Sequence, residues 1–348
     1  MNHRFQAFVY GAALALIIGW VLYIGKDVFV PIVFSILVFF VIVGLTRLQS
    51  RIPIVGRILP LPLRYTLSVA VIGLGLGVIT YLAIASKNNV AALAPQYQQS
   101  LLAAIQKVAA FLHIETEPTW NTLRQDFLAQ ISIQRVIGST FASVTSIVVG
   151  LLVVTLYAAL LLVEQRSFSA KIANLSRDPN TEARIRQVTT DINARIGSYL
   201  GLKTVLSILL GILSWAVMAF VGLEFAVFWA VLIALLNYIP YIGSVLGVFF
   251  PVLMAIVQFG TANQILAVLV PLSVVQFLVG NILDPFVMSK SLNLSPFAIL
   301  VSLTVWTGLW GIPGAFLAVP ITAILTIVLS EFPGSRPIAV LLSKNGDV

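Results

Sequence analysis

The fold is decided by the run FAVFWAVLIALLNYIPYIGSVLGVFFPVLMAIVQF, residues 225–259, which is apolar for about 35 residues except at Asn237-Tyr-Ile-Pro-Tyr-Ile-Gly243 in its middle. One straight helix of that length would overshoot a hydrocarbon core of about 30 Å. Each arm, Phe225–Asn237 and Ser244–Gln258, would extend roughly 20 Å, which suits half of a hairpin better than a full crossing. The run therefore predicts a re-entrant helical hairpin, which enters and leaves the membrane on the same side.

The same arrangement recurs further along the chain. The apolar run Pro296–Leu329 is broken at Trp310-Gly-Ile-Pro-Gly314, and Ser295 is a suitable N-cap ahead of Pro296. An ordinary span precedes each run, at residues 204–223 and 264–281. Span plus hairpin thus occurs twice in opposite orientations, an inverted repeat typical of secondary transporters, whose hairpin tips meet near the midplane. The alternative is a conventional eight-helix bundle in which each long run is a Pro-kinked span.

Composition agrees with a membrane location. The 348 residues are 59% hydrophobic and 9% charged, whereas an ordinary soluble domain is about 25% charged. We expect an all-α polytopic membrane protein with about eight membrane segments. Beside the runs above, the expected spans are residues 7–25, 28–46, 65–86 and 139–163.

Charge and cysteine usage exclude several classes of function. The net charge of +8 comes from short stretches between spans, so we predict no nucleic-acid partner. The chain has no cysteine, and His3 and His113 lie far apart in sequence, so we predict no metal and no cofactor. No P-loop, metalloprotease or serine-hydrolase motif occurs, so we predict that the chain is not an enzyme.

The distribution of basic residues predicts the topology. Residues 47–64 carry four arginines and no acid, and residues 164–203 carry seven basic against four acidic side chains. By the positive-inside bias both stretches, and both termini, are cytoplasmic in a cytoplasmic (inner) membrane. The predicted organisation is three N-terminal spans (1–86), an external amphipathic segment (87–138), a fourth span with a cytoplasmic helix (139–203), a transport core (204–330) and a cytoplasmic tail (331–348).

Two amphipathic helices are expected outside the spans. The external one carries an apolar stripe from Val90 to Leu112 and lies on the membrane or on its own protein, or it forms an oligomerisation surface. The cytoplasmic one begins at Asp178-Pro179, carries opposite charges four residues apart and leads into the span at residues 204–223. Those pairs are Glu182 with Arg186 and Asp191 with Arg195.

Polar residues at membrane depth mark the candidate site. The predicted spans and hairpins contain no charged residue, and Lys203, Glu224 and Asp284 stand at segment ends, so only Asp284 is a candidate coupling residue. Uncharged polar side chains and irregular backbone suit a small polar solute. For Gln276, a plain contact between helices is an equal alternative. The predicted substrate-binding residues are Asn237, Tyr238, Pro240, Tyr241, Gly243, Ser244, Gln276, Asn281, Gly311, Pro313 and Gly314.

Four ordered blocks in the last third of the chain carry a family resemblance. They are Leu236-Asn-Tyr-Ile-Pro-Tyr-Ile-Gly243, Gln276 with Asn281-Ile-Leu-Asp-Pro285, Met288-Ser-Lys-Ser-Leu-Asn-Leu-Ser-Pro296, and Gly311-Ile-Pro-Gly314 with Ala318-Val-Pro320. Together they resemble the AI-2 exporter (autoinducer-2 exporter-like) family. The resemblance implies secondary transport, with export of autoinducer-2 ascribed to some members and sodium/proton exchange to others. It also implies a homo-oligomer in contact with membrane lipid.

The sequence thus predicts a secondary transporter that moves a small polar solute, such as autoinducer-2 or a related metabolite. Three alternatives remain beside it. They are a sodium/proton-type antiporter of the same family, a passive channel with the same lining, and a membrane scaffold that recruits partners through its amphipathic segments.

Overall fold

A computed structural model describes residues 3–51, 58–75, 77, 81, 150, 153–164, 167, 171, 178–288 and 292–347. Over these ranges every regular element is a helix, which confirms the all-α prediction. The predicted external segment 87–138 lies outside the described residues, as do parts of the third and fourth predicted spans.

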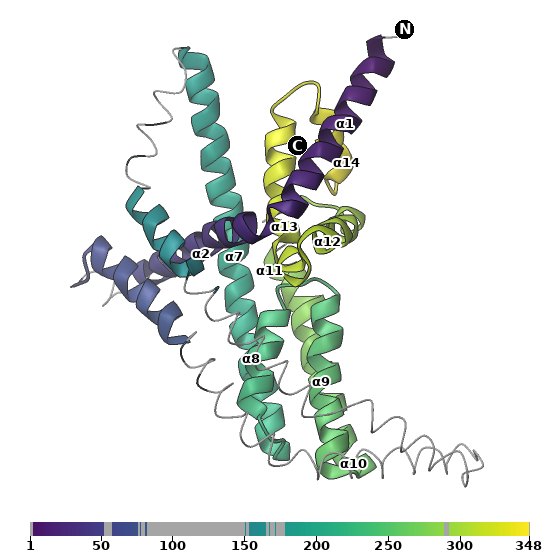
Figure 1. The fold of residues 1–348 in the computed structure, drawn as a ribbon. Coiled ribbons are helices and arrows are strands. Elements are labelled where there is room, and N and C mark those ends of the chain that lie inside the picture. The colour runs from purple at the N-terminus through teal and green to yellow at the C-terminus, as the bar shows by residue number, and fades with distance from the viewer. Residues whose placement is uncertain are drawn as a thin grey trace. The chain divides into compact units, whose positions relative to one another are not determined.

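The helices follow one another along the chain as drawn in Figure 1. Their bounds are α1 His3–Ile24, α2 Lys26–Arg51, α7 Pro179–Val221, α8 Ala226–Leu236, α9 Ile242–Phe259, α10 Ala262–Phe277, a π-helix η1 Leu278–Leu283, α11 Asp284–Met288, α12 Pro296–Trp310, α13 Ile312–Ser330 and α14 Arg336–Leu342.

Both interrupted apolar runs form two helices with a short break between them. The first run gives α8 and α9, and the second gives α12 and α13; in each case the two helices pack against each other. Ser295 is the N-cap of α12, and its hydroxyl oxygen accepts a hydrogen bond from the Ala298 N–H at 3.0 Å. The predicted positions of both breaks and of this cap are therefore confirmed.

Several helices have the length and composition to cross a membrane. Among the described residues these are Lys26–Thr46, Asn180–Val221, Ile242–Phe259, Ala262–Phe286 and Ile312–Ser330. Shorter apolar helices accompany them at Val9–Ile24, Leu61–Gly75, Val153–Glu164, Ala226–Leu236 and Pro296–Trp310. The chain is therefore a multi-pass membrane protein. Because α9 extends about 27 Å and reaches beyond the predicted arm, the re-entrant course and the total of about eight segments stay predictions.

Helix α7 joins two segments that the sequence analysis treats separately. It runs for 43 residues, through the amphipathic stretch and the following apolar span, across the predicted boundary between 203 and 204. It begins where expected, because Asp178 accepts hydrogen bonds from the Thr181 hydroxyl at 2.6 Å and the Thr181 N–H at 3.0 Å. These bonds lower the pKa of the Asp178 carboxyl. Arg186 and Glu182 form the expected ion pair, at 3.0 Å.

The chain divides into two compact units. The first comprises Met1–Val69, Leu151–Leu202 and Met288–Val348, and the second comprises Ala70–Gly150 and Lys203–Val287. The first unit therefore contains α12 and α13, and the second contains α8 and α9. Each unit has its own core of buried apolar side chains, around Phe40, Leu200 and Val319 in the first and around Leu210, Ile233 and Leu272 in the second.

Small residues allow the helices of the second unit to lie close together. The buried face of α9 is the row Gly243, Gly247, Pro251 and Ala255, at intervals of four residues. On α7, a Cβ atom at Gly211 would lie 3.1 Å from the Ala234 Cβ of α8. Such spacing of small side chains is a common way for membrane helices to approach each other.

The two breaks share two backbone features, although five residues separate α8 from α9 and one residue separates α12 from α13. The residue before the second helix has a positive φ in both, 62° at Tyr241 and 66° at Gly311. Shortly after it comes a buried glycine: a Cβ atom would lie 1.9 Å from the Leu236 carbonyl oxygen at Gly243, and 1.8 Å from that of Trp306 at Gly314. Only glycine fits there, because the end of the first helix occupies the space of a side chain.

Candidate functional site

One face of α7 holds the tip of the first hairpin, the break between α8 and α9. The Asn237 side-chain amide donates to the Ser207 hydroxyl at 3.0 Å, and the hydroxyls of Tyr238 and Thr204 lie 2.7 Å apart. Thr204 and Ser207 are three residues apart on a helix, so they lie on the same face. Two predicted site residues of the tip are thus fixed by polar side chains of α7.

A buried ion pair lies in the same unit. Lys203 Nζ is 2.8 Å from Asp284 Oδ2, and only 5% of the lysine side chain and 23% of the aspartate side chain are exposed. The second oxygen, Oδ1, is buried and has no hydrogen-bond partner among the described residues. Ionisable groups at such depth are costly and frequently functional. The candidate coupling residue Asp284 is therefore a partly satisfied carboxylate beside a fixed cation.

Asp284 follows an irregular turn of its helix. The π-helix η1 separates α10 from α11, and the Asp284 N–H donates to the Val279 carbonyl oxygen, five residues back. Pro285 has no N–H for an α-helical bond, and its ring would crowd the carbonyl four residues earlier. Single π turns of this kind often accompany functional sites. This turn places both Asn281 and Asp284 within the same helical segment as Gln276.

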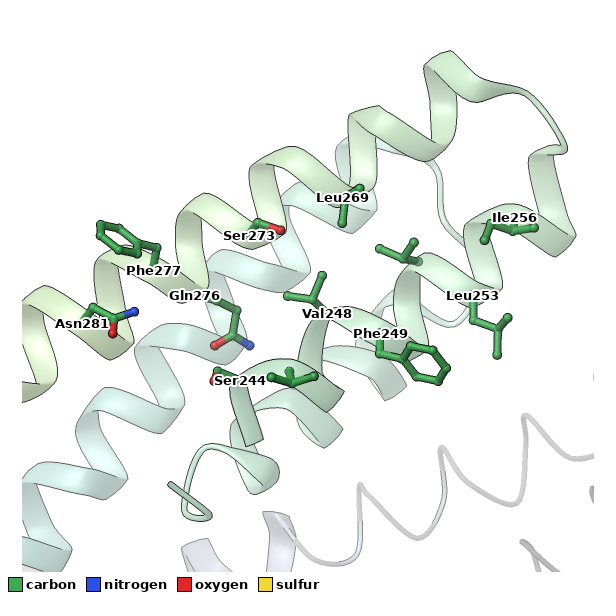
Figure 2. A pocket seen from close by; sticks show the side chains of 12 residues that line it. Ser244, Val248, Phe249, Leu253, Ile256, Leu269, Ser273, Gln276, Phe277 and Asn281 are labelled. Carbon is green, nitrogen blue, oxygen red and sulfur yellow. The ribbon is translucent and has the colours of Figure 1, made fainter. Parts of the chain in front are cut away.

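A groove of about 480 Å³ lies between α9 and α10 (Figure 2). Its polar lining consists of Ser244, Ser273, Gln276 and Asn281, and the remainder is apolar. In the close view Ser244, Gln276 and Asn281 lie toward one end, and Leu253 and Ile256 lie toward the other. The groove therefore offers a polar end near the first hairpin tip and an apolar end away from it.

Gln276 is the most unusual residue of the groove. Its side chain is 6% exposed, yet its Nε2 has no hydrogen-bond partner among the described residues. Figure 2 shows the side chain projecting from α10 toward Ser244 on α9. Gly247 makes room for it, since a Cβ atom there would lie 2.6 Å from Nε2. A buried amide N–H without an acceptor costs about 1–3 kcal/mol, which a bound acceptor would recover.

The remaining predicted residues of the first tip shape its backbone. Tyr241 has a positive φ and a half-exposed side chain, and its carbonyl oxygen accepts from the Ser244 hydroxyl at 2.8 Å. Pro240 is partly buried, and its carbonyl oxygen accepts from the Ile242 N–H at 2.6 Å. The structure therefore brings the predicted residues 237–244, Gln276, Asn281 and Asp284 into one unit.

The predicted residues Gly311, Pro313 and Gly314 lie in the other unit, at the break between α12 and α13. Apolar and aromatic side chains surround this second tip. The Trp310 ring N–H donates to the Leu22 carbonyl oxygen of α1 at 2.9 Å, and the Trp306 ring packs against the Trp310 ring at 5.1 Å between centroids. The Trp306 ring N–H also donates to the Thr322 hydroxyl at 3.3 Å, so tryptophan side chains supply both the packing and the hydrogen bonds at this tip.

Three polar residues of α7 were missed by the sequence analysis. Lys203, Thr204 and Ser207 were assigned to the end of a cytoplasmic helix or to an ordinary span. The available signal was their spacing at positions i, i+1 and i+4 in an apolar helix, which puts Lys203 and Ser207 on one face. Nothing in that spacing identifies Asp284, 81 residues later, as the partner.

These groups can bind and orient a solute or an ion. Within the described residues no three His, Cys, Asp or Glu side chains gather as they would around a metal ion. The groove offers one free amide N–H and several hydroxyl or amide groups, and the ion pair offers one free carboxylate oxygen. Such a combination of apolar walls and few polar groups is typical of sites for small molecules.

Several known proteins are similar in sequence to this chain over most of its length. The sequence profile described as "AI-2E family transporter" matches residues 12–334. The chain is 27% identical to "AI-2 transport protein TqsA" of Escherichia coli (strain K12) over 322 residues, 92% of this chain and 90% of TqsA. It is 28% identical to "Putative transport protein YhhT" of the same organism over 81% of this chain and 79% of that protein.

A shorter but more similar match is a "Putative transport protein" of Borreliella burgdorferi, 37% identical over 194 residues, 56% of this chain and 53% of that protein. The profile match extends from the first helix to beyond the end of α13, and so includes every block that carried the resemblance. The chain belongs to the AI-2E family of transporters.

Proposed function

We propose that this protein is a secondary transporter that moves a small polar solute across the cytoplasmic membrane, with the groove between α9 and α10 as part of its path. The single observation that carries this proposal is the Gln276 amide, which is buried at the polar end of the groove without a hydrogen-bond acceptor. A carbonyl, hydroxyl or ether oxygen of a solute would satisfy it. The apolar wall from Val248 to Ile256 would take the solute's less polar side.

Family membership supports transport, and the name of one relative supports a candidate solute. TqsA is named an AI-2 transport protein, and 92% of this chain aligns with it. Autoinducer-2 is therefore the first solute to test. In this proposal the broken helices are re-entrant hairpins of an inverted repeat, and both termini face the cytoplasm, in line with the basic stretches 47–64 and 164–203.

One observation favours a second candidate function, exchange of a monovalent cation or proton. Asp284 shares only one of its carboxylate oxygens with Lys203, and the other is buried and unsatisfied. A cation or proton that bound Asp284 would compete with the lysine, and would thereby change the contact between α7 and the helix of Gln276. In this case Asp284 is the coupling residue, and the Lys203 ammonium group competes with the transported cation or proton for the Asp284 carboxylate.

The test is solute flux in proteoliposomes that contain the purified full-length protein. Autoinducer-2 and uncharged polyols of similar size are offered to wild type, Gln276→Leu and Thr304→Val. The last is a matched control, because the exposed Thr304 hydroxyl only donates to the Leu300 carbonyl oxygen of its own helix. We expect saturable flux for at least one solute, a loss of about tenfold in kcat/KM for Gln276→Leu, and no change in the control.

Three results would contradict the proposal. Equal flux in wild type and Gln276→Leu would remove the groove from the path. Flux that does not saturate would indicate a channel, and absence of flux for every solute and for sodium or protons would favour the scaffold. For the second candidate, a pH gradient should drive sodium flux in wild type but not in Asp284→Asn.

A further inference from the structure

A second cavity, of about 320 Å³, lies entirely within the first unit. Its walls come from α7, the end of α13 and the C-terminal segment that begins with α14. The polar lining includes Asp191, Arg195, Thr326, Ser330, Arg336 and Asp347. Unlike the groove of the second unit, this cavity is lined by charged side chains.

The C-terminal segment is a fixed wall of this cavity. The Leu342 carbonyl oxygen accepts from the Ser295 N–H at 2.9 Å, at the start of α12. The Asn293 side chain accepts from the Lys344 N–H at 3.3 Å and donates to the Asp347 carbonyl oxygen. Ala339 of α14 is fully buried. Contacts at residues 339, 342, 344 and 347 therefore fix the C-terminal segment, which places the exposed residues Arg336 and Asp347 at the cavity.

Two walls of the cavity each carry one acidic and one basic side chain. Helix α7 contributes one acid and one base, Asp191 and Arg195, and the C-terminal segment contributes Arg336 and Asp347. Asp191 and Arg195 stand four residues apart, a spacing that favours pairing, yet neither makes an ion pair with any residue that the structure describes. The fifth charged residue, Glu331, already pairs with Arg184 at 3.0 Å.

The floor of the cavity offers acceptors rather than donors. The Thr326 hydroxyl donates to the Thr322 carbonyl oxygen at 2.8 Å, and the Ser330 hydroxyl donates to the Ile327 carbonyl oxygen at 2.7 Å. Each hydroxyl oxygen therefore keeps its lone pairs for a ligand N–H. A single anion would face two carboxylates, and a single cation would face two guanidinium groups, whereas a ligand with both charges matches all four.

We infer that this cavity is a binding site for a small zwitterion of the amino acid or dipeptide class, separate from the proposed transport path. Arg195 and Arg336 hold the carboxylate of the ligand, and Asp191 and Asp347 hold its ammonium group. The hydroxyl oxygens of Thr326 and Ser330 accept from its remaining N–H groups. Because the ligand contacts α7, α13 and the C-terminal segment together, its binding ties these three parts of the first unit to one another.

The test compares three probes of similar size that differ in their charged ends. Glycylglycine is a zwitterion, N-acetylglycine keeps only the carboxylate, and glycylglycinamide keeps only the ammonium group. Binding to the purified full-length protein in detergent is measured by isothermal titration and by the shift of Tm. We expect glycylglycine to bind and raise Tm, and both single-charge probes to bind at least tenfold more weakly.

Variants locate the site and control for folding. Arg195→Gln, Asp191→Asn and Arg336→Gln should each weaken glycylglycine binding about ten- to a hundredfold, since each removes a hydrogen bond to a charged group. Arg186→Gln is the matched control, because Arg186 lies on the same helix and pairs with Glu182 outside the cavity. Gln276→Leu should also leave this binding unchanged, which separates it from any effect on transport.

Three outcomes would overturn the inference. The first is that glycylglycine fails to bind the wild type. The second is that N-acetylglycine binds as well as glycylglycine, which would indicate a plain anion site. The third is binding that survives in all three cavity variants but is lost in Gln276→Leu, which would assign the probe to the groove. Should one variant fold poorly, the other two still test the cavity.

Discussion

The two hairpins share two backbone features at their tips and differ in the side chains around them. Both have a residue of positive φ before the second helix and a buried glycine that touches the first helix. Helix α13 buries nine of its 19 residues, whereas α9 buries four of 18 and leaves Val245, Phe249 and Leu253 exposed along the groove. At the first tip Asn237 and Tyr238 hydrogen-bond to side chains of α7, whereas at the second tip tryptophan rings pack together and donate their N–H groups.

From this difference we infer that the two hairpins have different roles in transport. Both units have a buried apolar core, and among the described residues α12 of the second hairpin carries one unsatisfied buried hydroxyl, that of Thr307. The first hairpin differs because it lies beside a buried ion pair and an unsatisfied amide. Groups that remain polar and unsatisfied in a membrane protein are expensive and usually serve function. The first hairpin with α7 and α10 is therefore the part in which substitutions should affect transport most.

The largest effect is expected at the buried ion pair. Lys203→Met or Asp284→Asn alone should cost about 3–5 kcal/mol of stability, because each strands a buried partner, and the double variant should recover much of the loss. Thermal unfolding of the single and double variants in detergent measures this. Arg184→Met, which breaks the exposed pair with Glu331 in the other unit, is the control and should cost at most about 1 kcal/mol. Additive losses at Lys203 and Asp284 would show that the pair does not act as one.

The next largest effect is a loss of stability on substitution of the buried glycine at each tip, and it should be similar in both hairpins. Gly243→Ala and Gly314→Ala should each destabilise by about 1–3 kcal/mol or more, since the new methyl group would overlap a carbonyl oxygen of the first helix. The controls are Gly280→Ala in the second unit and Gly308→Ala in the first, where a Cβ atom meets nothing within 4 Å. Yield and Tm compare the four variants. A tip variant as stable as its control would refute the close approach.

A smaller loss of stability is expected when the Tyr238 hydroxyl of the first tip is removed than in the two cases above. Tyr238→Phe removes the hydroxyl that lies 2.7 Å from Thr204, and should lower stability by about 1 kcal/mol. Thr304→Val on α12 removes a hydroxyl bonded only within its own helix and should change little. Urea or thermal unfolding gives both values. If the two substitutions cost the same, the polar attachment of the first tip to α7 contributes no stability.

Much of the fold follows from local pattern. The lengths of the apolar runs predict the helices. The breaks follow from Pro240 and Pro313, which lack a backbone N–H, and from Gly311, which permits a positive φ. The caps at Asp178 and Ser295 are local signals too. The amphipathic stretch was expected to lead into the following span, but the single helix of 43 residues was not, because its amphipathic and apolar halves have different patterns.

The site is less predictable because its contacts join distant residues. The candidate list included Gln276 and Asp284 as polar residues at membrane depth, but not the unsatisfied Nε2 or the partner Lys203. The pairing depends on how α7 packs against the helix after α10, which no periodicity encodes. The π turn before Pro285 likewise depends on tertiary packing, with the proline as its only local indication.

Substrate protection tests whether solute passes along the groove between α9 and α10. Because the chain contains no cysteine, single cysteines at Ser244, in the groove, and at Thr304, on α12, give a signal without background. Their rates of modification by a hydrophilic maleimide are compared with and without the transported solute. We predict that the solute slows modification of Ser244→Cys severalfold and leaves Thr304→Cys unchanged. Equal rates at Ser244→Cys with and without solute would show that the solute does not occupy this groove.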